Sequence, residues 1–426
     1  MNTQFDIAII GGGPVGAALA LALRDSRLNV CVLEARPANA ASNDARALAL
    51  SYGSRLLLAR LGVWDALRDV SEIRTIHISQ KQSFGRTVLH AAELKVPELG
   101  YVLPYTALQD ALTDALQHTL SPSLSDETAS HSTKRQSRQV ASYPASGKSV
   151  ARGAKSAGGE GRTIYGAQVT QLRGESDCAT IEYQQDGAEH TLHTRLAVVA
   201  DGGKLLAQQY PPKVHDYGQS ALITHITCST PQAHTAFERF TPQGPLALLP
   251  FQKGYELVWT APHQRAQEML IWDDARFLHE LQSHFGDRVG EFLTVGRRTC
   301  FPLGLRRAPQ QTPMPHTVLL GNAAQTMHPV AGQGFNMGLR DAWELSQEIL
   351  DAAPEALGTE VMLAAYRSQR RTDREAGIRF TDGLVRLFSN DLPLVSAGRA
   401  AALTALDCLP FVKKFVAKRM MFGANG

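Results

Sequence analysis

The sequence predicts an α/β fold in which a parallel sheet begins at the N-terminus, further strands are inserted in the middle, and helices finish the chain. Residues 5–34 follow the order strand, glycine turn, helix, strand, which is how a parallel sheet begins. Strand-like alternation recurs between residues 163 and 260, and the pattern after Val318 is helical. A chain of 426 residues exceeds the roughly 250–300 that one hydrophobic core spans, so we expect more than one domain.

The composition excludes several classes of protein. Apolar residues make up 44% of the chain, which is enough for large cores and excludes a wholly disordered protein. Lysine plus arginine number 43 and aspartate plus glutamate number 40, and the resulting net charge of +3 gives no support to nucleic acid as the partner. The five cysteines form no CxxC pair, so we expect neither a disulfide framework nor a zinc or other metal site.

The N-terminal region lacks the features of a signal peptide, because Asp6 stands where a positive region belongs. The longest run without charge, residues 7–23, has 17 residues. That run falls short of the about 20 apolar residues that span a bilayer. We therefore expect a cytoplasmic protein, soluble or peripheral at the inner membrane.

The first motif with chemical meaning is a glycine turn between the first strand and the first helix. Gly11, Gly13 and Gly16 have the GxGxxG spacing. The first permits a tight turn, the second lets the backbone approach a pyrophosphate, and the third lets helix and strand pack closely. Glu34 ends the second strand, where a carboxylate accepts hydrogen bonds from ribose hydroxyls. We predict a Rossmann-like dinucleotide-binding unit, with a purely structural turn as the alternative, and the unit alone does not separate NAD from FAD.

A second glycine motif lies far along the chain, in residues 318–336. This segment, VLLGNAAQTMHPVAGQGFN, has the pattern of a strand, a loop and a helix. Gly332 and Gly334 make a second close approach to a ligand, and the helix that starts at Gly334 directs its positive end at it. Two such sites suit a ligand long enough to touch both, and FAD has that length. A helix N-terminus also stabilises the negative charge of reduced flavin.

The composition changes at Ser121. From there to about residue 162 the chain is rich in Ser, Ala, Gly and basic residues and poor in large apolar ones. Residues 131–162 hold seven basic residues and one acid, Glu160. A long segment without periodicity is typical of disorder, so we expect residues 121–162 to be a disordered insertion. A patch that binds an anionic partner is the alternative.

Three segments together resemble the fingerprints of class A flavoprotein monooxygenases: the glycine turn with Glu34, residues 199–202, and residues 321–336. The similarity is closer to the ubiquinone-biosynthesis hydroxylases within that family. It rests on residues 44–50 (DARALAL), 237–241 (FERFT), 244–250 (GPLALLP) and 370–376 (RRTDREA), and on Gly321-Asn322 with Gln325. Most of the wider family has Gly-Asp in place of Gly321-Asn322. The similarity covers most of the chain outside 121–162 and the last twenty or so residues.

The resemblance implies a p-hydroxybenzoate-hydroxylase-like fold. In that fold an inserted mixed β-sheet substrate domain interrupts a Rossmann-like FAD-binding domain, and C-terminal helices follow. The expected ranges are 1–72, 100–205 and 300–350 for the FAD-binding domain, 73–99 and 206–299 for the substrate domain, and 351–426 for the C-terminal helical region.

The resemblance also implies residue roles at the ADP end of FAD. The glycines of the turn, Gly11, Gly13 and Gly16, hold this part of the cofactor together with Glu34. Arg46 reaches the pyrophosphate or the flavin side. Asp201 is a further cofactor residue, although Leu205 departs from the family pattern, which has a serine at that position.

At the flavin end the resemblance implies a second set of residues. The predicted cofactor residues here are Asn322 for the ribityl chain, and Gly332, Gly334 and Asn336 for the pyrimidine edge. An asparagine that only caps a turn is the alternative for Asn322. Pro329 lies on the face where oxygen and substrate meet. We interpret Pro329 and the preceding His328 as the catalytic residues, with a structural role as the alternative for His328.

The implied activity is that of an FAD-dependent NAD(P)H monooxygenase. NAD(P)H reduces the flavin, dioxygen forms a C4a-hydroperoxide, and its distal oxygen attacks an electron-rich phenol. The implied substrate is 2-polyprenyl-6-methoxyphenol, hydroxylated to the 1,4-benzoquinol in ubiquinone biosynthesis, with residues 246–251 as an apolar wall for ring and tail. Two alternatives stay open: a flavin-dependent dehydrogenase or reductase on the same scaffold, and a non-catalytic flavin-bound subunit of a biosynthetic complex.

The C-terminal segment has an apolar stripe beside basic residues. The stripe consists of Leu403, Leu406, Phe411, Phe415 and Val416, and the basic residues are Lys413, Lys414, Lys418 and Arg419. A basic amphipathic helix can lie on an anionic membrane, so we expect peripheral membrane contact. Packing of this helix onto the protein's own core is the alternative, and membership of a ubiquinone-biosynthesis complex is a further expectation.

Overall fold

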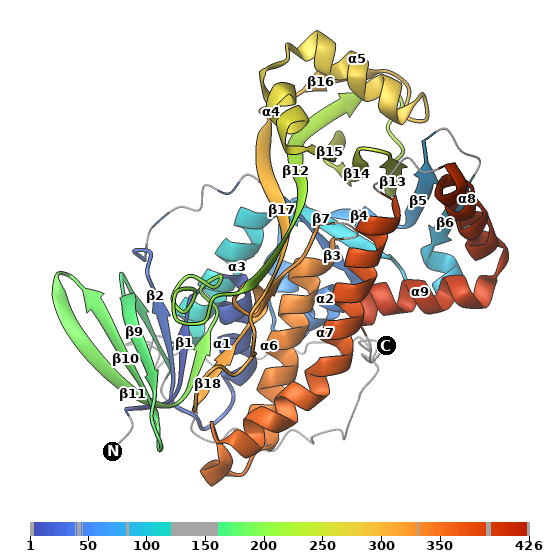
Figure 1. Ribbon diagram of the computed structural model, residues 1–426. Helices are drawn as coiled ribbons and strands as arrows, with labels where there is room; N and C mark the ends of the chain where they lie inside the picture. Colours follow the sequence, from blue (N-terminus) through green and yellow to red (C-terminus); the bar gives the residue numbers. More distant parts are fainter. Residues whose placement is uncertain are drawn as a thin grey trace, which may run out of the picture.

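The computed structural model describes residues 4–38, 40, 44, 46–81, 85–120, 161–329, 332–388 and 393–423. The predicted insertion lies outside these residues except for 161 and 162, which open a strand. Within the described residues the chain forms three sheets, and helices cover the first sheet and cap the largest one (Figure 1). The seven-stranded sheet and the nine-stranded sheet form separate parts of the molecule, which the long strands β12 and β17 connect.

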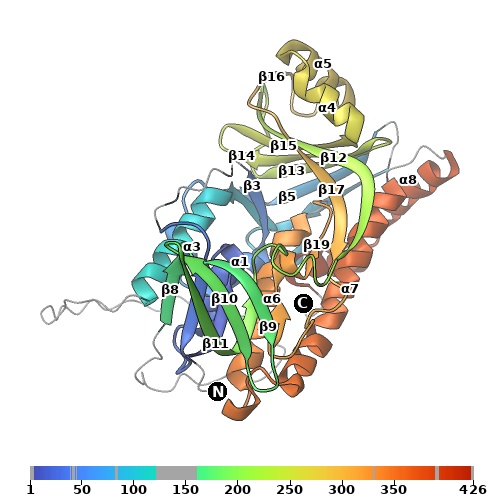
Figure 2. The same ribbon diagram turned by 60° about the vertical axis from the view of Figure 1, so that its left-hand side comes forward.

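The seven-stranded sheet starts with the predicted strand–helix–strand unit. Its strands are β1 (Phe5–Ile10), β2 (Val30–Glu34), β8 (Gly161–Tyr165), β9 (Gln168–Gly174), β10 (Ala179–Gln185), β11 (Ala188–Val199) and β18 (Thr317–Leu319). They lie in the order β8-β2-β1-β11-β10-β9, with β18 on β11. Figure 2 shows β9, β10 and β11 side by side. The β8, β2, β1, β11 and β18 pairings are parallel, and β9 and β10 extend β11 as an antiparallel meander. These five strands therefore end at one edge of the sheet, and β1, β2 and β11 end directly beside the glycine turn.

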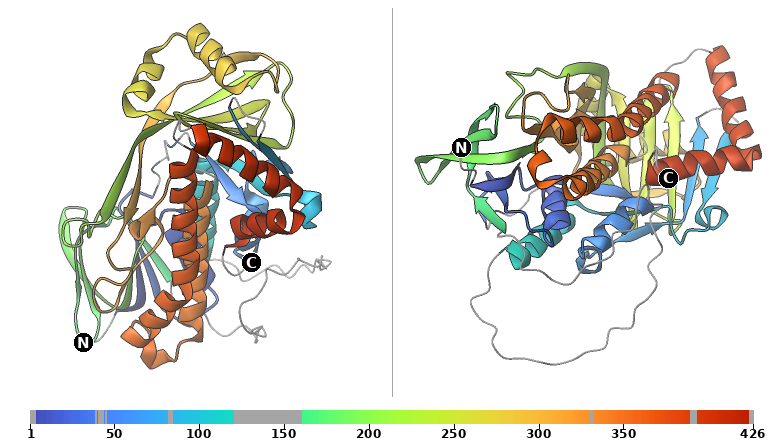
Figure 3. Two further views of the ribbon diagram at one scale, coloured as in Figure 1. Left: turned by 45° about the vertical axis from the view of Figure 1, so that its right-hand side comes forward. Right: turned by 90° about the horizontal axis from the view of Figure 1, so that it is seen from below.

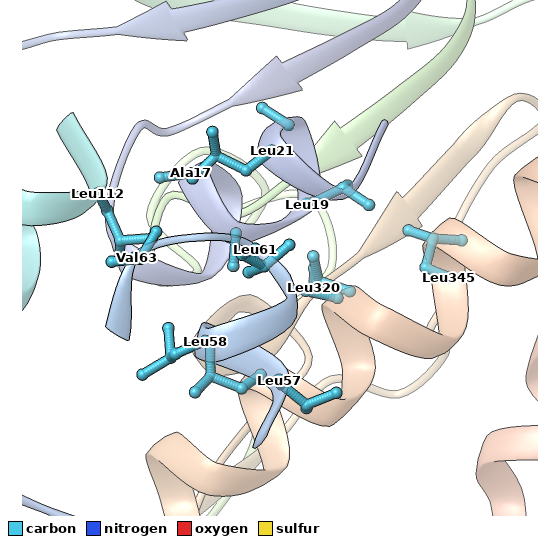
Figure 4. Packing of buried hydrophobic residues seen from close by; sticks show 14 of the residues in the cluster. Ala17, Leu19, Leu21, Leu57, Leu58, Leu61, Val63, Leu112, Leu320 and Leu345 are labelled. Carbon is cyan, nitrogen blue, oxygen red and sulfur yellow. The ribbon is translucent and has the colours of Figure 1, made fainter. Parts of the chain in front are cut away.

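Helices bury one side of this sheet. They are α1 (Pro14–Leu23), α2 (Tyr52–Arg60), α3 (Tyr105–Leu120), α6 (Gln333–Asp351) and α7 (Glu360–Phe388), with the short turns η1 (Trp64–Ala66), η2 (Ala91–Leu94), η3 (Gly321–Ala323) and η5 (Pro354–Ala356). Pro14 starts α1, where its fixed φ suits a helix and its missing N–H costs no hydrogen bond. Ala17, Leu57, Leu112 and Leu345 come from four different helices and share one core (Figure 4).

The nine-stranded sheet contains strands from both predicted substrate segments. They are β5 (Thr75–Gln80), β6 (Arg86–His90), β12 (Lys213–Cys228), β13 (Thr235–Thr241), β14 (Gly244–Phe251), β15 (Gly254–Pro262), β16 (Phe292–Val295), β17 (Thr299–Arg307) and β19 (Gln325–Thr326). Their order is β19-β17-β12-β15-β14-β13-β5-β6, with β16 on β12. Helices α4 (His263–Ile271) and α5 (Asp274–Phe285) pack on one face through a core that includes Trp259 and Phe277.

The opposite face of this sheet, which we call the inner face, turns away from α4 and α5. Part of it packs on the three-stranded sheet β3 (Ala47–Ser51), β7 (Gly100–Pro104) and β4 (Ser71–Ile73), which has the order β3-β7-β4. Ala236 and Phe251 of the inner face share a small core with Ile73 and Val102 of this sheet. The inner face is therefore held against the part of the chain that follows the N-terminal unit.

A buried ion-pair network fixes α6 to α7. Arg370 bonds to Asp341 (2.6 Å) and to Asp373 (2.9 Å), and Arg340 bonds to Asp373 (3.0 Å). The side chains of Arg370 and Asp341 are each 1% exposed. Removing one charge from such a network leaves its partners buried and unpaired, which is costly. The RRTDREA segment thus positions α6 against α7.

The chain ends in two helices, α8 (Pro393–Cys408) and α9 (Pro410–Phe422) (Figure 3). The burial of their side chains agrees only in part with the predicted apolar stripe and basic face. Lys413, a predicted basic surface residue, is buried and pairs with Glu93 (3.0 Å). Phe411 and Phe415 are exposed. The end of α9 docks on the start of α2, where the Ser51 hydroxyl donates to the Met421 carbonyl oxygen (2.9 Å). Among the described residues, no helix combines the length and apolar character needed to cross a membrane.

Candidate functional site

The turn between β1 and α1 uses its three glycines in two ways. Gly11 has φ of +109°, and a Cβ there would lie 2.7 Å from the Ala200 carbonyl oxygen. A Cβ on Gly16 would overlap the Gly11 carbonyl oxygen. Gly13 differs, because a Cβ there would meet open space, and this residue begins α1 without a capping side chain. The first turn of α1 therefore directs its N–H groups at open space, as a phosphate site requires.

Glu34 lies directly beside this turn. The Gly12 N–H donates to its Oε2 (2.7 Å), and the Arg36 backbone N–H and Nε donate to its Oε1 (2.9 and 2.8 Å). Burial pushes the pKa of Glu34 upward, but the hydrogen bonds from Arg36 and Gly12 outweigh it, and the pKa lies below its ordinary value. Glu34 is therefore an ionised acceptor that is already fixed in orientation at the end of β2.

Gln109 is a residue of this site that the sequence did not reveal. It lies on α3 and is buried, and its Nε2 donates to the Gly12 carbonyl oxygen (3.1 Å). Its Oε1 is buried and has no hydrogen-bond partner among the residues that the structure describes. A buried acceptor without a donor is costly, so a ligand donor beside the glycine turn would satisfy it. Its sequence signal was weak, because residues 105–120 contain many other polar side chains.

The N-terminal end of α6 is the second predicted cofactor site. Gly332 precedes the helix with φ of +60° and no capping side chain, and a Cβ on Gly334 would meet open space. Val15 of α1 joins the two sites, because Cβ atoms on Gly321 and Gly338 would both press on its side chain. The N-terminal ends of α1 and α6 are thereby held close together.

Asn336 makes its side-chain hydrogen bonds within the protein. Its Oδ1 accepts from the Ser51 N–H (2.8 Å) and the Ser54 hydroxyl (2.6 Å), and its Nδ2 donates to the carbonyl oxygens of Ala49 (3.1 Å) and Gly332 (2.6 Å). The side chain thus ties the N-terminal end of α6 to β3 and α2. A direct contact between Asn336 and flavin would have to use its backbone, and this role stays a prediction.

Asp201 and Asn322 lie in the loops after β11 and β18. The Asp201 carboxylate accepts from the backbone N–H groups of Gly203 (2.8 Å), Lys204 (3.0 Å) and Leu205 (2.6 Å), so it shapes its own loop. Asn322 is exposed on η3, and its backbone lies beside Gly203. Asn322 therefore remains accessible to a ligand, whereas the Asp201 carboxylate acts mainly on the backbone.

Arg46 lies at the start of β3, between the cofactor region and the nine-stranded sheet. Its guanidinium pairs with Asp44 (2.5 Å). The same group lies over the rings of Tyr105 (5.8 Å) and Phe301 (5.4 Å), within the range of cation–π attraction. Phe301 belongs to β17, so Arg46 links the predicted cofactor residues to the inner face.

His328 and Pro329 differ in exposure. His328 is 1% exposed, and burial lowers its pKa to about 4, so its imidazole is neutral at pH 7. Its ring packs edge-on against Tyr217 of β12, with 5.5 Å between the ring centres. The Tyr217 hydroxyl donates to Asp382 of α7 (3.1 Å). Pro329 is exposed, and its carbonyl oxygen accepts from the Gly332 N–H (2.9 Å), which connects it to the start of α6.

The inner face presents a mostly apolar surface. One row across it consists of Ile78, Glu238, Ala247, Val258 and Ile223, which lie in register on β5, β13, β14, β15 and β12. All five are half-buried. The predicted wall 246–251 contributes only alternate residues, because Leu246 and Leu248 point into the core under α4 and α5.

These features fit FAD. Two helix N-termini without capping side chains lie close together, with open space at Gly13 and Gly334. The ionised Glu34 and the buried Oε1 of Gln109 flank the first of them. A long ligand with a pyrophosphate in its middle and a ring that becomes anionic on reduction at one end satisfies both sites.

Comparisons with known proteins agree with this geometry. The family described as FAD binding domain matches residues 4–381. The chain is 32% identical to the protein slr1300 of Synechocystis sp., covering 100% of this chain and 94% of that protein. It is 29% identical to the ubiquinone hydroxylase UbiL of Rhodospirillum rubrum (98% and 89% covered). It is 30% identical to the 3-demethoxyubiquinol 3-hydroxylase of Escherichia coli (97% of each chain).

A solved structure has the same fold. The p-nitrophenol 4-monooxygenase PnpA of Pseudomonas putida superposes with a TM-score of 0.70 over 100% of both chains. The two sequences are 15% identical, so this similarity concerns the fold alone. It confirms the predicted α/β architecture with an inserted mixed sheet.

Proposed function

The chain belongs to the FAD binding domain family and is an FAD-dependent monooxygenase with NAD(P)H as co-substrate, and from this premise we propose that it hydroxylates a polyprenylated phenol in ubiquinone biosynthesis. The proposed reaction converts 2-polyprenyl-6-methoxyphenol to the 1,4-benzoquinol. One observation carries the proposal. The chain is similar over almost its full length to two relatives that are named as a ubiquinone hydroxylase and a 3-demethoxyubiquinol 3-hydroxylase. The position of the new hydroxyl on the ring is part of the proposal.

The proposed cofactor residues divide between the two helix N-termini. When bound, FAD accepts hydride from NAD(P)H and activates dioxygen. The glycine turn and Glu34 hold the ADP part, and the open first turn of α1 supplies N–H donors to the pyrophosphate. Arg46 and Asn322 contact the middle of the cofactor, and Asp201 keeps its loop in shape. Gly332, Gly334 and the backbone of Asn336 surround the flavin end.

The inner face is the proposed wall for the phenol ring and the start of its tail. Ala247, Val258 and Ile223 are apolar and half-buried, so they can exchange contact with water for contact with an apolar substrate. Exclusion of water from such a site also prevents side reactions of the activated oxygen with water, and it strengthens local electrostatic interactions. Apolar residues in this position support a substrate with a long isoprenoid chain.

Pro329 and His328 are the proposed residues on the reacting side of the flavin. The carbonyl oxygen of the exposed Pro329 accepts from the Gly332 N–H, which fixes the position of Pro329 relative to the start of α6. The imidazole of His328 is neutral at pH 7, because burial disfavours its protonated form. Its packing on Tyr217 keeps the ring in place.

The test is the origin of the new oxygen atom. Purified holoenzyme with NAD(P)H, labelled dioxygen and the short-tailed 2-prenyl-6-methoxyphenol should place one labelled atom in the new hydroxyl. NAD(P)H oxidation should depend on the phenol. Label from water, or equal turnover under argon, would overturn the proposal in favour of a dehydrogenase on the same scaffold.

We also propose peripheral membrane contact through α9, because the substrate tail resides in lipid. The helix exposes Phe411 (72%) and Phe415 (59%) beside the exposed Lys414, Lys418 and Arg419. Exposed aromatic rings among basic side chains are typical of helices that lie on anionic membranes. Figure 3 shows α8 and α9 on the side of the molecule away from the seven-stranded sheet. Membership of a ubiquinone-biosynthesis complex stays a prediction.

A further inference from the structure

Glu238 places a carboxyl group in the apolar row of the inner face. It lies on β13, in register with Ile78 of β5 and Ala247 of β14. The preceding Phe237 points to the other face, where its ring packs on Phe285 of α5 with 5.4 Å between centres. Because side chains alternate along a strand, Glu238 must point to the inner face. The FERFT segment thus contributes a core ring to one side and a carboxyl group to the other.

The inner face adjoins the cofactor region at strands β12 and β17, and β12 lies three strands from Glu238 on β13. The row next to that of Glu238 contains Ala221, which lies in register with Phe301. The guanidinium of Arg46 lies over the Phe301 ring. Glu238 therefore lies on the same face of the sheet as the residues that meet Arg46, and this face is the proposed wall for the phenol.

Glu238 has no polar partner of its own. It makes no hydrogen bond or ion pair with any residue in the described part of the chain. By contrast Glu256, another glutamate of the inner face, has a partner, because its Oε1 lies 3.2 Å from His225 Nδ1. Burial raises the pKa of Glu238 to about 7. The side chain is half-buried, and no hydrogen bond or ion pair within the described part of the protein explains its presence at this position.

We propose that Glu238 is a catalytic residue that binds the phenolic hydroxyl of the substrate and accepts its proton. The inference rests on the proposed function, since it assigns the recognition of the phenol within that site. The phenol O–H bond breaks and an O–H bond forms on the Glu238 carboxylate, while the bonding electrons stay on the phenolate oxygen. The ring thereby becomes richer in electrons at the positions where an electrophilic oxygen attacks.

The unpaired state of Glu238 is what this role requires. An acceptor that already holds a protein donor has to lose it before it binds a substrate hydroxyl. A carboxyl group whose pKa lies near the working pH accepts a proton readily and releases it again after the reaction. The apolar neighbours Ile78 and Ala247 place no competing donor beside the carboxylate, so a substrate hydroxyl can take this position.

The experiment compares two probes and two variants of the FAD-loaded protein. The probes are 2-prenyl-6-methoxyphenol and its methyl ether, which lacks the hydroxyl proton. The variants are Glu238→Gln and the control Glu280→Gln, which changes a half-buried glutamate on α5, on the far side of the same sheet. Calorimetric titration gives the dissociation constant of each probe, and product analysis gives the rate of hydroxylation.

The wild type should bind the phenol more tightly than its ether. Glu238→Gln should weaken phenol binding about tenfold, which removes this preference. It should lower hydroxylation about a hundredfold. Glu280→Gln should match the wild type in both measurements. Unchanged phenol binding and hydroxylation in Glu238→Gln would overturn the role of Glu238. Failure of the wild type to hydroxylate the phenol would instead overturn the proposed function.

A stability measurement separates the catalytic role from a structural one. Because Glu238 is unpaired, Glu238→Gln should retain its FAD and unfold at the same temperature as the wild type or higher. Loss of FAD together with a lower unfolding temperature would show that Glu238 supports the fold and would overturn the inference. Glu238→Asp keeps the acid on a shorter stem, so it should restore part of the preference for the phenol over its ether.

Discussion

The guanidinium of Arg46 lies 5.4 Å from the centre of the Phe301 ring. Arg46 directly precedes β3, and Phe301 lies on β17. Their contact therefore connects the predicted cofactor residues with the sheet that we propose as the substrate wall. Cation–π contacts of this kind contribute about 0.5–2 kcal/mol, more when water is excluded. The predicted cofactor residues and the inner face therefore share the guanidinium of Arg46. A movement of this group on one side can shift the side chains on the other.

Gly13→Val should abolish most FAD binding without unfolding the protein. A Cβ at Gly13 meets open space, and its φ of −64° suits any residue, so the chain itself tolerates the change. The same space is the proposed pyrophosphate site, which the valine side chain would fill. Flavin absorbance after purification measures the loss, and circular dichroism reports the fold. Gly16→Ala is the contrasting variant: its Cβ would overlap the Gly11 carbonyl oxygen, so it should lower folding yield itself.

Acidification should destabilise the protein through His328. Below pH about 6.5 the unfolded chain binds a proton at this residue, whereas the folded chain does so only near pH 4. The free energy of unfolding should thus fall by up to about 3 kcal/mol between these values. Thermal unfolding over this range should show a shallower pH dependence for His328→Gln. The exposed His190→Gln serves as the control, and an unchanged slope in His328→Gln would contradict the prediction.

Arg370→Met should destabilise the protein by about 3–5 kcal/mol, because it leaves the buried Asp341 without its cationic partner and weakens the pairing of Asp373. Since α6 starts at the proposed flavin site, FAD should also dissociate more readily. The neighbouring Arg371 is exposed, so Arg371→Met should unfold at the wild-type temperature. Equal unfolding temperatures for the two variants would contradict a role of the network in holding α6 on α7.

Replacing Phe411 and Phe415 together by serine should lower binding to vesicles of phosphatidylethanolamine and phosphatidylglycerol about tenfold or more, through the loss of two apolar side chains. Both rings are exposed, so the FAD content should not change. This double variant is a sharper test than truncation of α9, because the end of α9 bonds to Ser51. Leu293→Ser, at an exposed position on β16, is the control. Unchanged sedimentation of the double variant with vesicles would exclude α9 as the contact.

Local patterns predicted the elements closest to the cofactor. The strand at 5–10, the helix that starts at Pro14, and Glu34 at the end of the second strand all lie where the sequence placed them. These features depend on neighbours within a few residues, so spacing and residue type suffice. The sequence did not reveal Gln109, whose contact with Gly12 joins residues far apart in the chain.

The C-terminal helices show the limit of pattern alone. The apolar and basic residues there fit one amphipathic helix, but Pro410 starts a separate helix and Lys413 is buried against Glu93. Which side of a helix meets the protein depends on partners that the helix sequence does not contain. Burial of Lys413 also removes one of the charges on which the membrane prediction was based.

The glycine turns, the order of the elements and the need for a long dinucleotide follow from local sequence, because backbone geometry at glycine and at helix termini is a local property. What each side chain does depends on how distant segments pack. Packing satisfies Asn336 with four hydrogen bonds inside the protein and gives Glu238 no partner among the residues that the structure describes. Both residues stand in conspicuous motifs, yet partners, burial and the resulting pKa arise only when distant strands and helices pack together.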